Sequence, residues 1–462
     1  MIMKRWNEKG FYRYVLALAL PIMLQNGITN LVGLLDNMMI GRIGTEQMSG
    51  VSIVNQLLLV YNLAIFGATA GPGIFMSQFH GSGDAEGMRY TFRFKLLACL
   101  FMWAAGTAVL LLFGTPLAQA WIHGDGVDDT ALTLRSAEEY LRVMLFGLLP
   151  FAVKELYAST LRENGETVVP MQASVAAVLI NLGLNYVLIF GKLGAPVLGV
   201  TGAAIATVIS RFAECAIVML HTHRHADRYP FLRGVYASLR IPGVLTGEML
   251  RKSLPLVLNE LLWATSQTMV SRCFAERGLQ VVAAYNISSA VTGVSSAIFL
   301  AFGSAAAILM GNLLGAGALD DARKTAPRII RFSALVCAAV GLLQIGLSGL
   351  FPQLYNTSAD IRDLARWFIL INGCFQPFFA VSNSAYFTLR AGGSVFITMV
   401  FDSAYEWLVA TPVAAALAFL TSCPILGIYL AVLLTQAFKA VLGIVYVRRG
   451  KWVRNLTVGA GA

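Results

Sequence analysis

The stretch Gln78-Phe-His-Gly81-Ser-Gly83 is matched 234 residues later by Asn312-Leu-Leu-Gly315-Ala-Gly317. Each half of the 462-residue chain also contains six long apolar stretches. The sequence therefore predicts two structurally related halves of like orientation, each with six helices. Further matches are Pro21 with Pro255 and Gly44 with Gly278 at the same spacing, and Leu161-Arg162 with Leu389-Arg390 and Gly199 with Gly427 at a spacing of 228.

The composition indicates a membrane protein. The chain is 57% apolar and 13% charged, whereas about a quarter of the residues of an ordinary soluble protein are charged. Apolar runs of about 18 residues or more are typical of transmembrane helices. We therefore expect an all-α polytopic protein with twelve spans at 11–35, 48–75, 88–115, 134–160, 166–190, 199–221, 250–275, 282–310, 325–351, 362–389, 394–420 and 424–448.

The basic residues predict the orientation of these spans. With the N-terminus inside, the inner loops and tails hold 23 Lys and Arg residues and the outer loops hold seven. The positive-inside rule then places both termini in the cytoplasm, as an even number of spans also requires. The net charge of +10 is therefore ascribed to contact with the lipid bilayer of the inner (cytoplasmic) membrane and not to nucleic-acid binding.

The loops suggest how the chain is organised. We expect an N-lobe over 1–221, a cytosolic linker over 222–249, and a C-lobe over 250–462 that ends in a basic tail. The glycines of the repeated motif suit tight turns between helices. No phosphate-binding loop is present, so the chain needs no cofactor, and an ion gradient or a partner must supply energy. Because the two halves are fused, a monomer is expected to be sufficient.

Asp36 is the first candidate for an ion site. It is expected to close the first span, and Asn181 and Asn185 lie four residues apart on the fifth. Burial raises the pKa of a carboxyl group, whereas amide donors or a bound cation keep it ionised. Asp36 with Asn181 and Asn185 is thus a candidate H⁺ or Na⁺ site, the only metal site expected. Alternatively, Asp36 is an interfacial acid paired with Arg42, and the asparagines bond between helices.

The seventh span contains a second acid. Glu260 shares a helical face with Trp263 and Gln267. A carboxylate beside an indole ring suits a lipophilic cation, because the ring also attracts positive charge. We therefore expect a substrate or proton site here, with a structural hydrogen bond as the alternative.

Asp402 and Glu406 lie four residues apart on the eleventh span. Two acids in this position repel each other if both are ionised, so one holds a proton unless a cation lies between them. They are a further candidate substrate or proton site. Two other sets, Lys154 with Glu155 and Arg211 with Glu214, are expected to be local, structural ion pairs.

Several of these segments, taken together, resemble those of multidrug and toxic compound extrusion (MATE) transporters. The resemblance covers almost the whole chain. It is carried by Pro21-Ile-Met-Leu-Gln25, Asp36-Asn37-Met-Met-Ile-Gly41-Arg42-Ile-Gly44, Gln78…Gly81-Ser-Gly83-Asp84, Leu254-Pro255…Asn259-Glu260-Leu-Leu-Trp263 and Leu389-Arg390-Ala-Gly392-Gly393.

The resemblance implies a V-shaped, two-lobe exporter of cationic, often aromatic compounds, driven by inward H⁺ or Na⁺, in which Asp36 is a cation site. Family members often carry Asp where this chain has Ser394, and some carry an acid where it has Asn181 and Asn185. We therefore expect multidrug efflux by ion-coupled antiport with alternating access. The alternative is a flippase of a lipid-linked saccharide or cell-wall precursor. An enzyme is not expected, because no catalytic groups converge within the spans.

Overall fold

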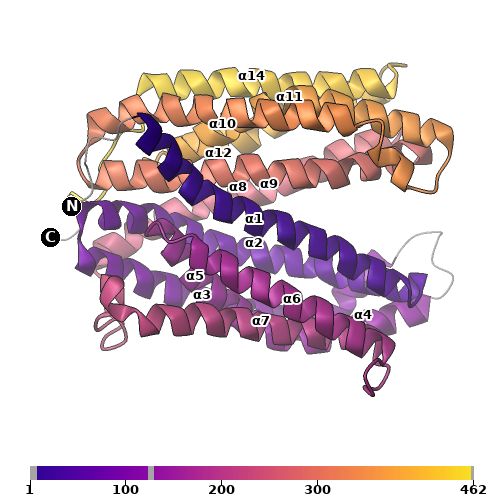
Figure 1. Cartoon of the computed structure of the whole chain (residues 1–462), viewed down its shortest axis with the longest axis horizontal. Coiled ribbons are helices and arrows are strands. Elements are labelled where there is room, and N and C mark those ends of the chain that lie inside the picture. The colour runs from indigo at the N-terminus through magenta and orange to yellow at the C-terminus, as the bar shows by residue number, and fades with distance from the viewer. Residues whose placement is uncertain (1–7, 123–129, 459–462) are drawn as a thin grey trace. The chain divides into compact units, whose positions relative to one another are not determined.

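The computed structural model describes residues 8–122 and 130–458, and within these ranges the chain is helical (Figure 1). The helices follow one another as twelve spans, which confirms the expected fold class. The first six spans are α1 (Glu8–Gly41), α2 (Thr45–Ser82), α3 (Ala85–Trp121), α4 with α5 (Thr130–Met144, Leu148–Glu163), α6 (Val168–Phe190) and α7 (Gly199–Arg224). The other six are α8 (Gly243–Ala275), α9 (Leu279–Gly315), α10 (Leu319–Leu347), α11 (Ala359–Ala391), α12 with α13 (Val395–Met399, Thr411–Phe419) and α14 (Ile425–Arg449).

Two of the spans are interrupted. A 3₁₀ turn, η1 (Leu145–Gly147), separates α4 from α5, and Pro150 follows in the first turn of α5, where a missing N–H is tolerated. Two π-helical segments, η5 (Val400–Ala404) and η6 (Glu406–Ala410), separate α12 from α13. Such wide turns occur often at functional sites.

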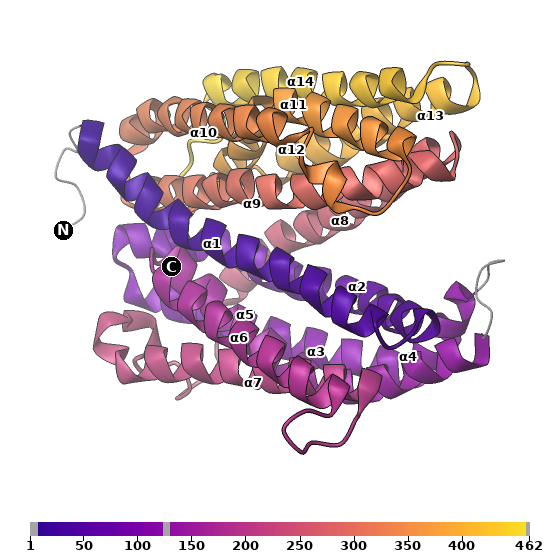
Figure 2. The ribbon, with the colours of Figure 1, turned by 45° about the vertical axis from the view of Figure 1, so that its right-hand side comes forward.

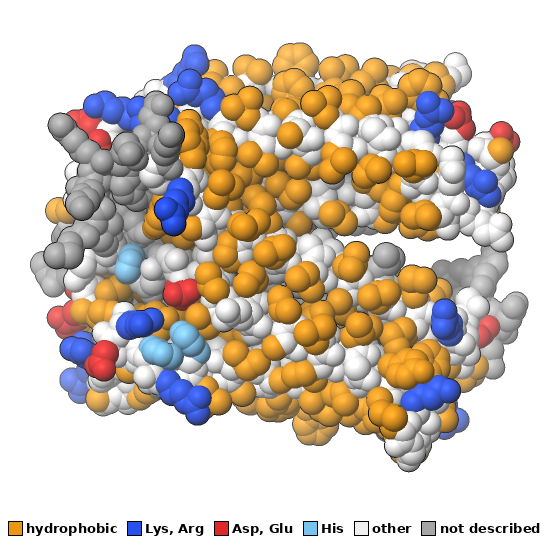
Figure 3. Space-filling model, in the orientation of Figure 1, with side chains coloured by type: hydrophobic (Ala, Val, Ile, Leu, Met, Phe, Trp, Pro, Cys, Tyr) orange, Lys and Arg blue, Asp and Glu red, His pale blue; other side chains and the backbone are white. Residues whose placement is uncertain are grey.

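Most of the helices suit a membrane. Within the described residues, nine are long and apolar enough to span one. The remaining spans are the two interrupted ones and α8, which carries Glu248, Arg251, Lys252 and Glu260. In Figure 3 hydrophobic side chains cover the middle of the helices on the visible face, and Lys and Arg lie towards helix ends.

The contacts divide the chain into two compact units. The C unit contains the described residues up to Met23, Ser77–Asp84 and those from Leu254 onward; the N unit contains Leu24–Met76 and Ala85–Ser253. Two long helices, α1 and α8, thus pass from one unit to the other within two residues of the repeat-related Pro21 and Pro255. The expected lobe and linker boundaries remain a prediction.

Each unit is a layered helix bundle. In the C unit, α11 packs against α9, α10 and α14 (Figure 1). In the N unit, α7 packs against α4, α5 and α6 (Figure 2). Small residues allow the close approaches: a side chain at Gly341 would overlap the backbone of Gly373, and one at Gly202 would overlap that of Leu188. Close packing of this kind is typical of helices in membranes.

The repeated glycine motif has two functions, of which the sequence predicted one. Gly83 and Gly317 have φ angles of +76° and +73° and form the turns after α2 and α9, as expected. The preceding glycines instead permit a close crossing within the C unit. A Cβ on Gly81 would overlap the backbone carbonyl of Asn312, and one on Gly315 would overlap that of Gln78.

The C-terminal segment fixes this crossing. The fully buried Gln78 donates from Nε2 to the carbonyl oxygens of Ala391 (2.9 Å) and Arg454 (3.3 Å). Its Oε1 accepts from the backbone N–H of Leu456 at 2.7 Å. Trp452, which is 1% exposed, packs against Gly392. The end of the chain therefore holds the last turn of α2 on the C unit.

A matched pair of glycine substitutions tests the crossing. Gly315→Ala should lower the unfolding free energy by about 1–3 kcal/mol, because the new methyl group forces α2 and α9 apart. Gly293→Ala in the same helix has open space around it and should be neutral or stabilising, since alanine favours a helix. Thermal unfolding in detergent compares the two. Equal stability of both variants would contradict the proposed close packing.

Candidate functional site

The first site lies between α1 and α6 in the N unit. Asp36 is inside α1, more than one turn before its end at Gly41, so the expectation that it closes the helix was wrong. Its side chain is partly buried. The Nδ2 of Asn185 donates to Asp36 Oδ1 at 2.7 Å. The structure thus brings the predicted residues of α1 and α6 together.

Asn181 completes this site. One of its amide atoms lies 3.0 Å from Asp36 Oδ1 and 3.1 Å from Oδ2, and the other lies 3.2 Å from Thr207 Oγ1. With its nitrogen towards the carboxylate, Asn181 donates to both oxygens and accepts from Thr207. Asn185 is 1% exposed, and its Oδ1 accepts no hydrogen bond from the described residues. We call Asp36, Asn181, Asn185 and Thr207 the Asp36 site.

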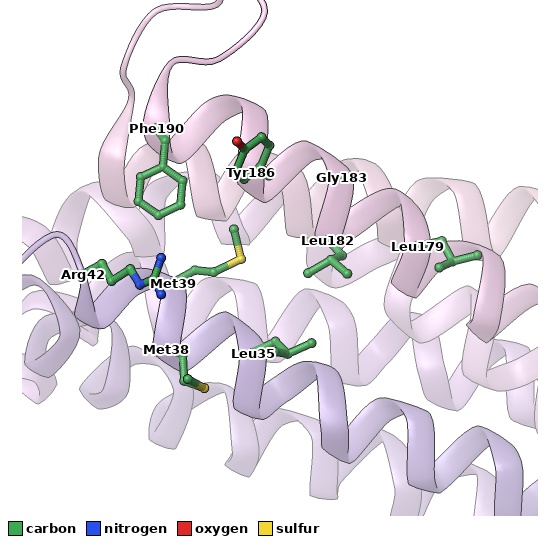
Figure 4. Close-up of a pocket in the computed structure, with 9 residues that line it drawn as sticks. All are labelled: Leu35, Met38, Met39, Arg42, Leu179, Leu182, Gly183, Tyr186 and Phe190. Atoms are coloured by element: carbon green, nitrogen blue, oxygen red, sulfur yellow. The ribbon is translucent and has the colours of Figure 1, made fainter. Parts of the chain in front are cut away.

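Asp36 is held by amides and not by a base. It makes no ion pair with Arg42 within the described part of the chain. Arg42 instead lies at one end of an apolar groove that runs beside the site between α1 and α6 (Figure 4). This cavity has a volume of about 540 Å³ and is lined by Leu35, Met38, Met39, Arg42, Leu179, Leu182, Gly183, Tyr186 and Phe190.

The second site lies in the C unit around Asp402 and Glu406. The Nζ of Lys439 on α14 donates to Asp402 Oδ1 at 2.6 Å and to Glu406 Oε1 at 2.8 Å. The lysine side chain is 6% exposed and that of Glu406 is 2% exposed. The cation between the two acids is therefore provided by the protein itself.

Amide groups also donate to the two acids. Asn259 Nδ2 donates to the second oxygen of Asp402, Oδ2, at 3.0 Å, and Gln436 Nε2 shares Glu406 Oε1 with the lysine at 2.9 Å. Both acids belong to the π-helical segments η5 and η6. We call Asn259, Asp402, Glu406, Gln436 and Lys439 the lysine cluster.

Glu260 lies beside the lysine cluster and interacts with its member Asn259. It is partly buried and takes part in no ion pair within the described residues, and it lies within electrostatic reach of Arg390 and Asp402. Trp263 is 43% exposed and Gln267 is half-buried. No described hydrogen bond joins either of them to Glu260, so the expected grouping of these three side chains remains a prediction.

Sequence reasoning missed Lys439, although the repeat carries a signal for it. At the spacing of 228, Lys439 corresponds to Arg211 and Asp402 to Ser174. The same relation appears in the contacts, because Gln25 donates to Ser174 at 2.7 Å as its equivalent Asn259 donates to Asp402. In each half, an amide of the first span thus donates to the fifth span, and the sixth span carries a base.

The predicted structural ion pairs are only partly confirmed. Lys154 and Glu155 form an ion pair at 3.2 Å, as expected. The prediction for Arg211 and Glu214 was wrong. Arg211 donates to the carbonyl of Gly147 at 3.3 Å and lies over the ring of Phe151, and Glu214 faces Lys154 at 3.8 Å. The pairing rule for neighbours on one helix failed because partners on other helices were closer.

A further buried pair, Lys95 with Glu163, is explained most simply as structural. The Lys95 side chain is fully buried and also donates to Ser159 Oγ at 3.2 Å. Lys95→Met should lower the unfolding free energy by about 3–5 kcal/mol, because it leaves a buried carboxylate uncompensated. Lys95→Met/Glu163→Leu should be more stable than the single variant. Unfolding midpoints of the variants measure the difference, and additive losses would contradict a direct pair.

Comparison with known proteins identifies the family. The MatE family model matches residues 21–187 and 255–415. The probable multidrug resistance protein NorM of Thermotoga maritima is 26% identical, covering 96% of this chain and 93% of its own. The multidrug resistance protein MdtK of Edwardsiella ictaluri is 24% identical and covers 81% and 79%.

Solved structures share the fold. A mutant of the Vibrio cholerae MATE transporter VcmN superposes with a TM-score of 0.87 at 18% identity, covering 97% of this chain and 98% of that one. An outward-facing multidrug resistance MATE family transporter gives a TM-score of 0.85 at 17% identity, with 96% of both chains covered. Because the family model spans both repeats and the helical fold agrees with it, the chain belongs to the MatE family and is a multi-pass membrane transporter, not an enzyme.

Proposed function

We propose that the protein is an antiporter that exports cationic, often aromatic compounds in exchange for H⁺ or Na⁺. The observation that carries this proposal is the Asp36 site, a carboxylate within a membrane-spanning helix that is held by two amides and by no base. An unbalanced charge at this depth costs at least about 2.5–3.5 kcal/mol on insertion scales. A proton or a monovalent cation from solution would therefore stabilise the site by neutralising this charge.

The oxygens of the Asp36 site suit either ion. A proton neutralises the carboxylate directly. Sodium requires several oxygen ligands, as hard cations do, and Asn185 Oδ1 is a buried oxygen that accepts no hydrogen bond from the described residues. It would serve as such a ligand beside the Asp36 carboxylate. Binding of either ion changes how Asp36 attracts the amides of α6, and so links ion occupancy to the contact between α1 and α6.

The charge of the C unit supports a cationic substrate. Three carboxylates (Glu260, Asp402 and Glu406) lie near two bases, Arg390 and Lys439. If all five groups are ionised, the region keeps one net negative charge. Glu260, which has no ion-pair partner in the described residues, is the group that we assign to the positive charge of the substrate. Asp402 and Glu406 are then available only if Lys439 releases them.

The remaining features agree with transport across the inner membrane. The excess of Lys and Arg at one set of loops supports a cytoplasmic location of both termini. Repeated six-helix halves suit alternating access, in which one half moves against the other. The relatives named as multidrug resistance proteins support export of several compounds by this chain. A fused pair of halves needs no partner, so we propose a monomer.

The contacts of the bases within the spans argue against the flippase. Lys95, Lys154, Arg211 and Lys439 all lie within the spans. Each of these bases is engaged by a carboxylate or by a backbone carbonyl of the described residues. They therefore form no free basic patch for the phosphates of a lipid-linked precursor. Antiport of cations remains the better proposal.

Efflux from proteoliposomes tests the role of Asp36. We expect a fluorescent cationic dye to move under an imposed Na⁺ gradient or an imposed pH gradient, but not under both equally. Asp36→Asn should abolish the gradient-driven component, because an amide neither binds a proton at neutral pH nor carries the charge that attracts Na⁺. The exposed Asp360→Asn is the control and should transport like the wild type.

Two outcomes would contradict this assignment. Dye efflux by Asp36→Asn at the wild-type rate would exclude Asp36 as the coupling site. If no dye moves under either gradient, antiport of cations is wrong, and transfer of a fluorescent lipid-linked saccharide between leaflets becomes the next assay.

Glu260 is tested by comparing a charged with an uncharged substrate. Glu260→Gln should raise the KM for a monovalent cationic dye about tenfold, which corresponds to about 1.4 kcal/mol, because it removes one attractive charge. The KM for a neutral dye of similar size should change little. Equal effects on both dyes would show that Glu260 acts through packing and not through charge.

A further inference from the structure

We infer that Lys439 is a built-in cation that occupies the C unit in the way a dissolved H⁺ or Na⁺ occupies the Asp36 site, so that ion coupling is confined to the N unit. This inference deepens the proposed function and rests on it, because it assumes that transport is coupled to an ion. The lysine Nζ lies 2.6 Å from one carboxylate and 2.8 Å from the other, which is the distance of charge-assisted hydrogen bonds.

The two sites solve the same electrostatic problem in different ways. At the Asp36 site, neutral amides are the only described donors to the carboxylate, so positive charge must come from solution. In the lysine cluster, Asn259 and Gln436 also donate, but an ammonium group lies between the acids. Because this ammonium group is covalently attached, it cannot be exchanged across the membrane.

Burial explains why Lys439 can take the place of a dissolved cation. The Lys439 side chain is 6% exposed and Glu406 is 2% exposed. A buried ammonium between two carboxylates is held by attraction that water does not screen. A free cation that binds there must displace it and leave the lysine charge uncompensated, which is costly. The cluster therefore does not bind a coupling ion while Lys439 is present.

The repeat offers a matched comparison. Arg211 occupies the position in the first half that Lys439 occupies in the second, and it makes no ion pair within the described residues; it donates to a backbone carbonyl and lies over Phe151. Ser174 replaces Asp402 there. The basic residue is thus common to both halves, but within the described residues only the base of the C unit lies within hydrogen-bond distance of two acids.

The experiment measures thermal unfolding of purified full-length protein in NaCl and in choline chloride, at pH 7.5 and at pH 5.5. In Lys439→Gln, Asp402 and Glu406 lose their cation. The unfolding temperature should fall in choline at pH 7.5 and should rise by several degrees in NaCl or at pH 5.5, as either ion takes the lysine's place. The wild type should show a smaller response, from the Asp36 site alone.

The other charged groups that face the cluster are Glu260 on α8 and Arg390 on α11.

Two further variants distinguish this inference from simple destabilisation. Lys439→Gln/Asp402→Asn has the net charge of the wild type and should lose the added dependence on Na⁺ and pH. Arg211→Gln should be destabilised with no rescue by either ion. A double variant that is no more stable than Lys439→Gln would overturn charge compensation by Lys439.

The inference is also overturned if Lys439→Gln responds to Na⁺ and pH only as the wild type does. These readouts need no transport. A failure of dye efflux in the assays above would therefore refute the proposed antiport while leaving the outcome for Lys439 separately measurable.

Discussion

Charge inside the membrane is the constraint on which this structure depends. A buried carboxylate or ammonium is stable only if another group of the protein, or a bound ion, compensates it. The chain meets this requirement with ion pairs between helices, as in Lys439 with Asp402 and Glu406 and in Lys95 with Glu163. Asp36 is compensated by amides only. That difference separates groups that hold helices together from the carboxylate that we propose as the site of the coupling ion.

The same constraint explains why helix packing and the sites cannot be treated separately. The pairs of Lys439 with Asp402 and of Lys95 with Glu163 each join two helices. Glycines such as Gly202 and Gly341 permit close approach of other helices within the units. Neutral hydrogen bonds between Gln78 and the C-terminal segment hold the last turn of α2 within the C unit. Polar contacts therefore fix the places at which the helices cross.

Much of the fold was predictable from the sequence. Long apolar runs gave the twelve spans, and the repeat gave two related halves, because both signals are local or periodic. Helix ends were less certain, since polar residues such as Asp36 and Asn37 interrupt an apolar run without ending the helix, which continues to Gly41. The turn role of Gly83 and Gly317 followed from glycine itself, but the crossing at Gly81 and Gly315 depends on a partner helix.

The sequence allowed us to predict which residues belong to the sites, but not which side chains contact one another. Asp36, Asn181 and Asn185 stood out because polar groups are rare in apolar spans, and the structure brings them together. The pairing of Lys439 with Asp402 joins α14 to η5, and no rule for neighbours on one helix reveals it. The failed pairing of Arg211 with Glu214 has the same cause, because distance in space overrides spacing in sequence.

The most direct test of the account is competition at equilibrium between a cationic dye and the coupling ion, measured on protein in lipid nanodiscs. If ion occupancy of Asp36 drives release of the substrate, the apparent Kd of the dye should rise with Na⁺ or with acidity. That dependence should vanish in Asp36→Asn. Dye binding by the wild type that is independent of both ions, or a dependence that persists unchanged in Asp36→Asn, would contradict the central claim.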